Sequence, residues 1–169
     1  MAIDALVKPF LSLPLFRGLK PLQLSEIVRR AERIVYRPGA IIAAEDQVSD
    51  AAILIVSGTC IRRTDDGKNK QEELLPEGSM VAELSMLVEM VHAATFVAKD
   101  QVRALRLTRE KMHEVMQEDP SLATHFSSHI LKRLQLLAED LNAVDALIVG
   151  SAPSFQPVVD QGSGPHAAR

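Results

Sequence analysis

The hydrophobic residues follow different periodicities in successive parts of this chain. Between Pro21 and Ala31 the apolar positions recur at i, i+3, i+4 and i+7, which is the pattern of one buried face of an α-helix. This face consists of Leu24, Ile27, Val28 and Ala31. A shorter, weakly amphipathic stretch precedes it and is stopped by Pro14. The pattern therefore predicts an N-terminal helical segment over residues 1–14, followed by a second helix.

The periodicity changes between residues 34 and 107. Short runs rich in Val, Ile, Leu and Thr recur about every ten residues, separated by turn residues such as Ser57-Gly58. Many short strands at this spacing are typical of a β-sandwich or roll. The strongest hairpin signal is Asp66-Gly67, because both residues tolerate the positive φ angles of a tight turn.

Helical periodicity returns after Thr108, a suitable N-cap for a short helix over residues 109–117. The stretch 121–149 contains no Gly or Pro and predicts a long helix. Its apolar residues step by four and three, forming a heptad seam of Ile130, Leu134, Leu137, Leu141, Val144 and Ile148. The seam could instead pack on the roll, but its length favours a homodimer. Residues 150–169 are rich in Gly, Pro and Ser, and we expect them to be disordered.

Composition narrows the class of protein. The chain has 169 residues, of which 47% are hydrophobic, and its formal net charge is −3. These values fit one soluble domain without the strong field of a dedicated nucleic-acid binder. The lone Cys60 can form neither an internal disulfide nor a four-ligand zinc site. The chain lacks an apolar run of about 18 residues and a signal-peptide pattern, so we expect a cytoplasmic protein without a membrane span.

No catalytic motif stands out in the sequence. The chain contains no His-x-His pattern of the kind that β-roll metalloenzymes use, and no nucleophile elbow or Cys/His pair stands out. His125 and His129 lie at i and i+4 of the long helix, but no third ligand is visible, so we expect surface histidines and no metal site. The protein is therefore not expected to be an enzyme.

An α-like patch interrupts the β region at residues 78–95, which read GSMVAELSMLVEMVHAAT. A local conflict of this kind often marks a functional site. Here the chain resembles the cyclic-nucleotide-binding domain family, and the resemblance extends from about Leu15 to Leu141. It includes Leu15-Phe16, the Arg37-Pro38-Gly39 turn and Asp50 before AAILIVSG.

The resemblance implies an α+β fold, an antiparallel β-roll or jelly-roll flanked by N-terminal helices and a long C-terminal helix. The domain would span residues 15–149, with the roll at 34–107 and the C-terminal helices at 109–149.

The same resemblance implies a ligand site. Its residues would be Val81, Ala82, Glu83, Leu84, His92, Ala93 and Ala94. Glu83 would accept the ribose 2′-hydroxyl, and the short helix that it opens would direct backbone N–H groups at the cyclic phosphate. Ala93 follows the position of the family's phosphate-binding arginine, where guanine-selective kinase domains tend to carry Thr. The resemblance therefore favours cAMP over cGMP.

The sequence departs from the family pattern at this site. The family's Gly and Arg are replaced by Ala82 and His92, its Phe and Pro by Val81 and Val91, and its earlier Gly-Asp pair by Asp46-Gln47. Loss of one charge-assisted hydrogen bond costs about 1.5 to 3 kcal/mol, or roughly ten- to a hundredfold in affinity. Three interpretations stay open: weakened cyclic-nucleotide binding, a dimeric protein-interaction module without nucleotide, and a different anionic ligand.

The region after the long helix indicates whether the domain is followed by an effector. In the resembling transcription factors this helix leads into a DNA-binding helix-turn-helix, which needs two further helices. Residues 150–169 lack helical periodicity. We therefore expect a regulatory or sensor protein without its own DNA-binding or catalytic effector, which acts through the dimer or through an unknown protein partner.

Overall fold

The computed structural model describes residues 2–65, 67 and 69–150. The chain divides into two compact units, Met1–His129 and Ile130–Arg169. The first unit contains all of the strands and the shorter helices, and the long helix α4 (Pro120–Gly150) begins in the first unit and continues in the second. The segment expected to be disordered lies outside the described residues from 151 onward, whereas Gly150 is the last residue of α4.

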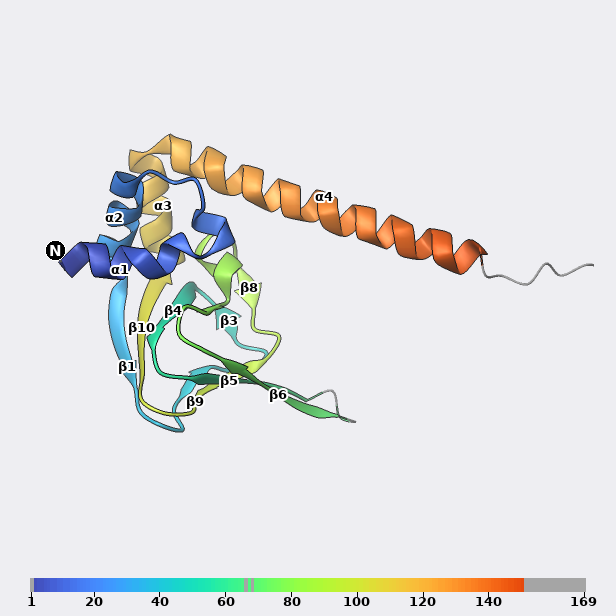
Figure 1. The fold of residues 1–169 in the computed structure, drawn as a ribbon, viewed down its shortest axis with the longest axis horizontal. Coiled ribbons are helices and arrows are strands. Elements are labelled where there is room, and N and C mark those ends of the chain that lie inside the picture. Colours follow the sequence, from blue (N-terminus) through green and yellow to red (C-terminus); the bar gives the residue numbers. More distant parts are fainter. Residues whose placement is uncertain (1, 66, 68, 151–169) are drawn as a thin grey trace, which may run out of the picture. The chain divides into compact units, whose positions relative to one another are not determined.

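Two four-stranded antiparallel sheets form a β-roll (Figure 1), and a pair of short strands adjoins them. The first sheet has the order β1-β10-β4-β7, with β1 (Glu32–Tyr36), β10 (Val102–Thr108), β4 (Ala51–Ser57) and β7 (Met80–Val81). The second has the order β2-β9-β5-β6, with β2 (Ile41–Ala43), β9 (Thr95–Ala98), β5 (Cys60–Asp65) and β6 (Lys70–Leu75). The short pair is β3 (Val48–Ser49) and β8 (Met90–Val91). This arrangement confirms the predicted α+β roll.

The core of the roll lies between the two sheets. β4 is a continuous apolar run that is buried from Ala51 to Ile55, and it lies between β10 and β7 in its sheet. The core cluster consists of Ile42, Ala43, Ile53, Ile55, Cys60, Val81, Ala98, Val102 and Ala104. Burial raises the pKa of the Cys60 thiol, so this residue is the small strand hydrophobe that its sequence context indicates.

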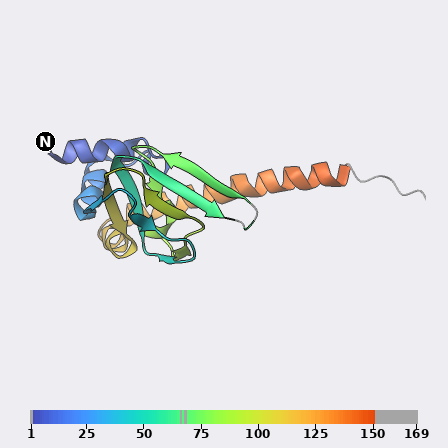
Figure 2. The ribbon, with the colours of Figure 1, turned by 90° about the horizontal axis from the view of Figure 1, so that it is seen from below.

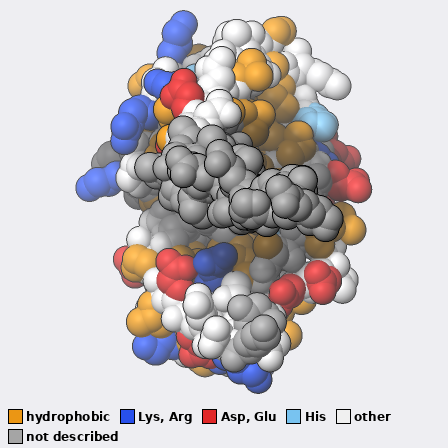
Figure 3. All heavy atoms as spheres, turned by 90° about the vertical axis from the view of Figure 1, so that its right-hand side faces the viewer, with side chains coloured by type: hydrophobic (Ala, Val, Ile, Leu, Met, Phe, Trp, Pro, Cys, Tyr) orange, Lys and Arg blue, Asp and Glu red, His pale blue; other side chains and the backbone are white. Residues whose placement is uncertain are grey.

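The predicted hairpin around Gly67 is formed by β5 and β6, which pair in register from Cys60↔Leu75 to Asp65↔Lys70. Asp66 lies outside the described residues, and Gly67 has the positive φ, 78°, that the turn requires. Opposite charges face each other across these strands, as in the pair Arg63–Glu72 at 2.7 Å. Acidic and basic side chains are likewise interspersed over the face shown in Figure 3, which agrees with the near-balanced composition.

The helices of the first unit gather at one end of the strands (Figures 1 and 2). They are α1 (Ala2–Leu11), the 3-10 helix η1 (Pro14–Phe16), α2 (Pro21–Arg30), α3 (Arg109–Glu118) and the first turns of α4. Phe10, Phe16 and Phe126 are fully buried and pack edge to face. The ring centroids of Phe10 and Phe16 are 5.1 Å apart, and those of Phe16 and Phe126 are 5.9 Å apart. This aromatic cluster joins α1 and η1 to the start of α4.

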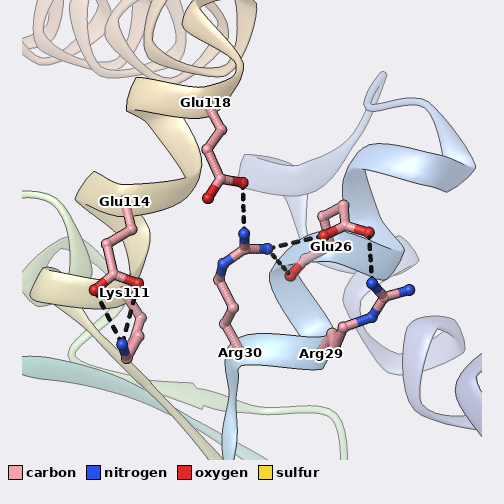
Figure 4. A network of polar contacts seen from close by, with 6 residues as sticks. All are labelled: Glu26, Arg29, Arg30, Lys111, Glu114 and Glu118. Carbon is pink, nitrogen blue, oxygen red and sulfur yellow. Dashed lines mark hydrogen bonds and ion pairs between the residues drawn. The ribbon is translucent and has the colours of Figure 1, made fainter.

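An ion-pair network joins α2 to α3 (Figure 4). The Arg30 guanidinium donates to the Glu26 carboxylate at 2.9 Å on its own helix and to the Glu118 carboxylate on α3. The Arg30 side chain is only 20% exposed, whereas that of Arg29, which pairs with the same Glu26, is 61% exposed. Arg30 is therefore half-buried, and it is the residue of this network that links α2 to α3.

The junction between α3 and α4 is held from α2 as well. The Gln23 side-chain amide donates to the Asp119 carboxylate at 2.8 Å and to the Ser121 hydroxyl at 3.0 Å. Asp119 in turn accepts the Ser121 backbone N–H at 3.0 Å, which caps the first turn of α4. These hydrogen bonds lower the pKa of Asp119.

The predicted seam lies on an exposed part of α4. Leu134, Leu137, Leu141 and Val144 are between 50% and 68% exposed, and Ile130 is half-buried. Ile148 belongs to the same predicted seam but lies outside the part of α4 whose side chains are described. No described helix is sufficiently long and apolar to cross a bilayer.

Candidate functional site

Ala82 lies within the segment that the sequence singled out, residues 78–95. It connects β7 to the 3-10 helix η2 (Glu83–Met86), with φ 53° and ψ 46°. This left-handed conformation costs an alanine about 1 to 2 kcal/mol, because Cβ approaches the following carbonyl oxygen. The backbone at Ala82 thus adopts a conformation suited to glycine although the glycine of the family pattern is absent.

Asp46 has the same kind of conformation, with φ 62°, and occupies the position of the other glycine in the family pattern. Aspartate tolerates this conformation better than alanine does, because its short polar side chain can bond locally. The Asp46 backbone N–H donates to the His92 carbonyl at 2.9 Å, and the His92 N–H donates to the Gln47 carbonyl at 3.0 Å. The structure therefore brings two departures from the family pattern, Asp46-Gln47 and His92, together on neighbouring segments.

His92 is half-buried immediately after β8, and its ring lies edge to face with that of Phe96 at a centroid distance of 6.5 Å. Burial lowers the pKa of His92 below its ordinary value, and the negative charge of Asp50 partly opposes this shift. At neutral pH the imidazole is therefore mostly uncharged. It then offers one N–H donor where an arginine would offer a charged, forked group.

The other predicted site residues differ in accessibility. Glu83 and Leu84 are half-buried on η2, and Ala93 is exposed. Val81 and Ala94 are each only 1% exposed, so their side chains pack in the interior. Any contact that these two residues make with a ligand would have to come from their backbone.

An ionic cluster near His92 was not predicted from the sequence. The Arg106 guanidinium on β10 donates to both carboxylate oxygens of Asp50, at 2.7 and 2.8 Å, and to the Glu32 carboxylate at 2.9 Å. Glu32 and Arg106 are direct partners in the register of β1 and β10. The alternating run VRALRL signals a strand but carries no information about which strand pairs with it.

Two contacts from α3 reach the segments around residues 78–95, which we call the cassette. Neither contact could be predicted from the sequence pattern. The His113 Nε2 lies 3.2 Å from the carbonyl oxygen of Leu87, directly after η2. The Arg109 side chain donates to the Ser49 carbonyl at 3.4 Å and pairs with Glu89 at 3.8 Å. The end of η2 and the β3–β8 pair are thus both held by α3.

The expectation that His125 and His129 are surface residues was wrong. Both are half-buried, with ring centroids 4.4 Å apart. The His125 Nε2 lies 3.0 Å from the Leu15 carbonyl oxygen, because η1 packs over the first turns of α4. His125 therefore has a structural role in holding η1.

Comparison with known proteins agrees with this geometry. The family model described as the cyclic nucleotide-binding domain matches residues 33–119. The Cyclic AMP receptor protein of Thermus thermophilus is 27% identical over 156 residues, which cover 90% of this chain and 72% of that protein. The cAMP-dependent protein kinase regulatory subunit of Aspergillus niger is 33% identical over 100 residues, covering 57% of this chain and 23% of that protein.

A solved structure shows the same fold. The N-terminal domain of a transcriptional regulator from Streptomyces coelicolor superposes with a TM-score of 0.73 at 19% identity, covering 82% of this chain and 95% of that one.

Proposed function

Because the chain belongs to the cyclic nucleotide-binding domain family, we propose that it is a regulatory protein whose cassette around η2 binds a cyclic nucleotide. The observation that carries this proposal is the glycine-like backbone at Ala82. An alanine is held there at a cost in free energy, and strained backbone of this kind clusters at functional sites. This strained backbone at the position of the family's glycine supports a ligand site at the cassette.

Two residues of this chain would make the polar contacts. Glu83 would accept the ribose 2′-hydroxyl, as the family pattern implies, from its half-buried position on η2. His92 would face the phosphate, and it would bind more strongly once protonated. Ala93 is exposed beside it, so an adenine base would meet a small apolar side chain without a hydroxyl, which favours cAMP over cGMP.

Calorimetric titration of the purified chain with cAMP and with cGMP tests the proposal. We expect weak binding with a preference for cAMP, and His92→Arg should raise the affinity at least about tenfold by restoring a charge-assisted bond. Gln71→Arg, which adds the same charge on the exposed strand β6, is the matched control and should leave the affinity unchanged. Absence of binding by both the wild type and His92→Arg would overturn the proposal.

We also propose that the protein acts as a homodimer through α4. The exposed apolar stripe of Leu134, Leu137, Leu141 and Val144 supports this proposal. Exposing such a stripe to water costs free energy, and pairing with the same stripe of a second copy would bury it. If neither cyclic nucleotide binds, this stripe would instead favour the second candidate, a dimeric protein-interaction module.

A further inference from the structure

We propose that Arg62 on β5 binds the phosphate of the cyclic nucleotide and supplies the positive charge that the family pattern places at the position of His92. This inference rests on the proposed function and adds a ligand-binding residue to the site. The residues that the sequence predicted for the site include no Lys or Arg, and the His92 imidazole is mostly uncharged at neutral pH. A phosphate bound there would therefore meet no permanent cation unless another strand provides one.

Arg62 lies on the face of the second sheet that is turned toward the core. β5 starts with Cys60, which is fully buried in the core cluster, and side chains two residues apart on a strand share a face. Arg62 is also the direct register partner of Phe96 on β9, which packs against the same core cluster. Both neighbours therefore place the Arg62 side chain on the core-facing side of β5.

Phe96 links Arg62 to His92. The Phe96 ring lies edge to face with the His92 ring at a centroid distance of 6.5 Å. Residues directly opposite each other in an antiparallel pair have Cβ atoms about 5 Å apart, so Arg62 adjoins Phe96 from the β5 side. A phosphate beside His92 would therefore lie within reach of the long Arg62 side chain.

The position of Arg62 breaks the apolar pattern of this face. A charged residue on the core-facing side of a strand is unfavourable unless it has a function, because burial of a charge costs free energy. The Arg62 side chain is nevertheless 43% exposed, although Cys60, two residues earlier, is fully buried. The core-facing side of β5 thus opens to solvent between these two residues, and the guanidinium is accessible to a ligand that enters there.

Glu73 orients Arg62 and leaves it able to bind an anion. The two residues are register partners on β5 and β6, and the Arg62 Nη1 donates to the Glu73 carboxylate at 3.2 Å. A guanidinium has five N–H donors, so this one hydrogen bond leaves donors for a phosphate oxygen. The Glu73 side chain is 61% exposed. Water weakens an ion pair that is exposed to this extent, and a bound phosphate can therefore compete with Glu73.

The neighbouring pair of Arg63 and Glu72 provides an internal comparison. It repeats the same cross-strand arrangement with a contact of 2.7 Å, and the Arg63 side chain is 50% exposed. The register partner of Arg63 on β9 is Thr95, so Arg63 lies on the opposite face of the sheet from Arg62 and Phe96. Arg63 thus has the same charge and the same type of partner, but it does not face the proposed site.

Titration with cAMP followed by nuclear magnetic resonance, which measures weak affinities, tests the inference. Arg62→Met should weaken binding of cAMP about tenfold or more, because it removes a charge-assisted hydrogen bond. It should also reduce the salt dependence of binding, because the lost contact is between opposite charges. Adding His92→Arg to Arg62→Met should restore the affinity, since the new arginine again provides a cation for the phosphate.

Arg63→Met is the matched control and should leave the affinity for cAMP unchanged, and circular dichroism checks that each variant is folded. If cAMP binds, equal affinities of the wild type and Arg62→Met, equal losses in Arg62→Met and Arg63→Met, or an unchanged salt dependence would overturn the inference while the proposed function stands. Absence of cAMP binding by the wild type and by His92→Arg would overturn the proposed function, and this inference with it.

Discussion

His92 is joined to Gln47 by a backbone hydrogen bond of 3.0 Å, and its carbonyl accepts the N–H of Asp46. The ladder between β3 and β8 continues through these bonds, so main-chain contacts set the position of the His92 backbone independently of its side chain. Substitutions at His92 should therefore change the chemistry of the site without moving the segment that carries it.

The affinity for a cyclic nucleotide should depend on pH through His92. A bound phosphate favours imidazolium, and burial lowers the pKa of His92 below its ordinary value of about 6.5. The affinity should therefore rise severalfold as the pH falls from about 7.5 to about 5.5, with most of the rise below about pH 6.5. Calorimetric titration at several pH values measures this dependence, and equal, tight binding at all of them would contradict it.

Two measurements separate this effect from a general effect of acid. His92→Arg should bind with an affinity that is nearly independent of pH in this range, since arginine stays charged. The stability of the free protein should change in the opposite direction. Because the pKa of His92 is lowered in the folded state, its contribution to stability is present above about pH 6.5 and is lost as the pH falls.

Ala82→Gly should stabilise the protein. At φ 53° glycine relieves the clash of Cβ, and this gain exceeds the extra entropy of glycine in the unfolded chain. We expect the free energy of unfolding in urea to rise by about 1 kcal/mol. Ala93→Gly, at a described residue without positive φ, is the control and should leave stability unchanged or lower it. A decrease in stability for Ala82→Gly similar to that of the control would contradict the prediction.

The double variant Leu134→Glu with Leu141→Glu should convert a dimer into a monomer, because it places charges within the apolar stripe of α4. Analytical ultracentrifugation at micromolar concentration measures the mass. Leu136→Glu is the matched control, because Leu136 is 53% exposed on the same helix but lies outside the seam. A wild-type protein that is monomeric under these conditions would be incompatible with the proposed dimer.

Arg30→Met should lower the free energy of unfolding by about 1 to 2 kcal/mol, because it leaves Glu118 without its partner on α2 and opens a half-buried contact. Arg29→Met removes a surface ion pair with Glu26, which also pairs with Arg30. It should change the free energy of unfolding by less than about 0.5 kcal/mol. Urea unfolding of both variants gives the comparison. Equal losses would mean that Arg30 does not connect the helices energetically.

Features that depend on local chemistry were predictable. Thr108 accepts the Lys111 backbone N–H at 3.2 Å and caps α3, as its side chain and position indicate. The helix face of Leu24, Ile27 and Val28 is buried. The error concerns packing instead: His125 was expected on the surface because the helix pattern contains no information about η1, whose Leu15 carbonyl oxygen lies 3.0 Å from the His125 Nε2.

The sequence by itself determined the order of helices and strands, because periodicity, caps and turn residues act over a few neighbouring positions. Its resemblance to the family implied the α+β roll and the position of the candidate cassette. Only the tertiary structure decided that Asp46-Gln47 meets His92, that Arg106 binds Asp50 and Glu32, and that Ala82 is held at positive φ. These features depend on which strands pair and in which register, and that choice is made by contacts between segments far apart in the chain.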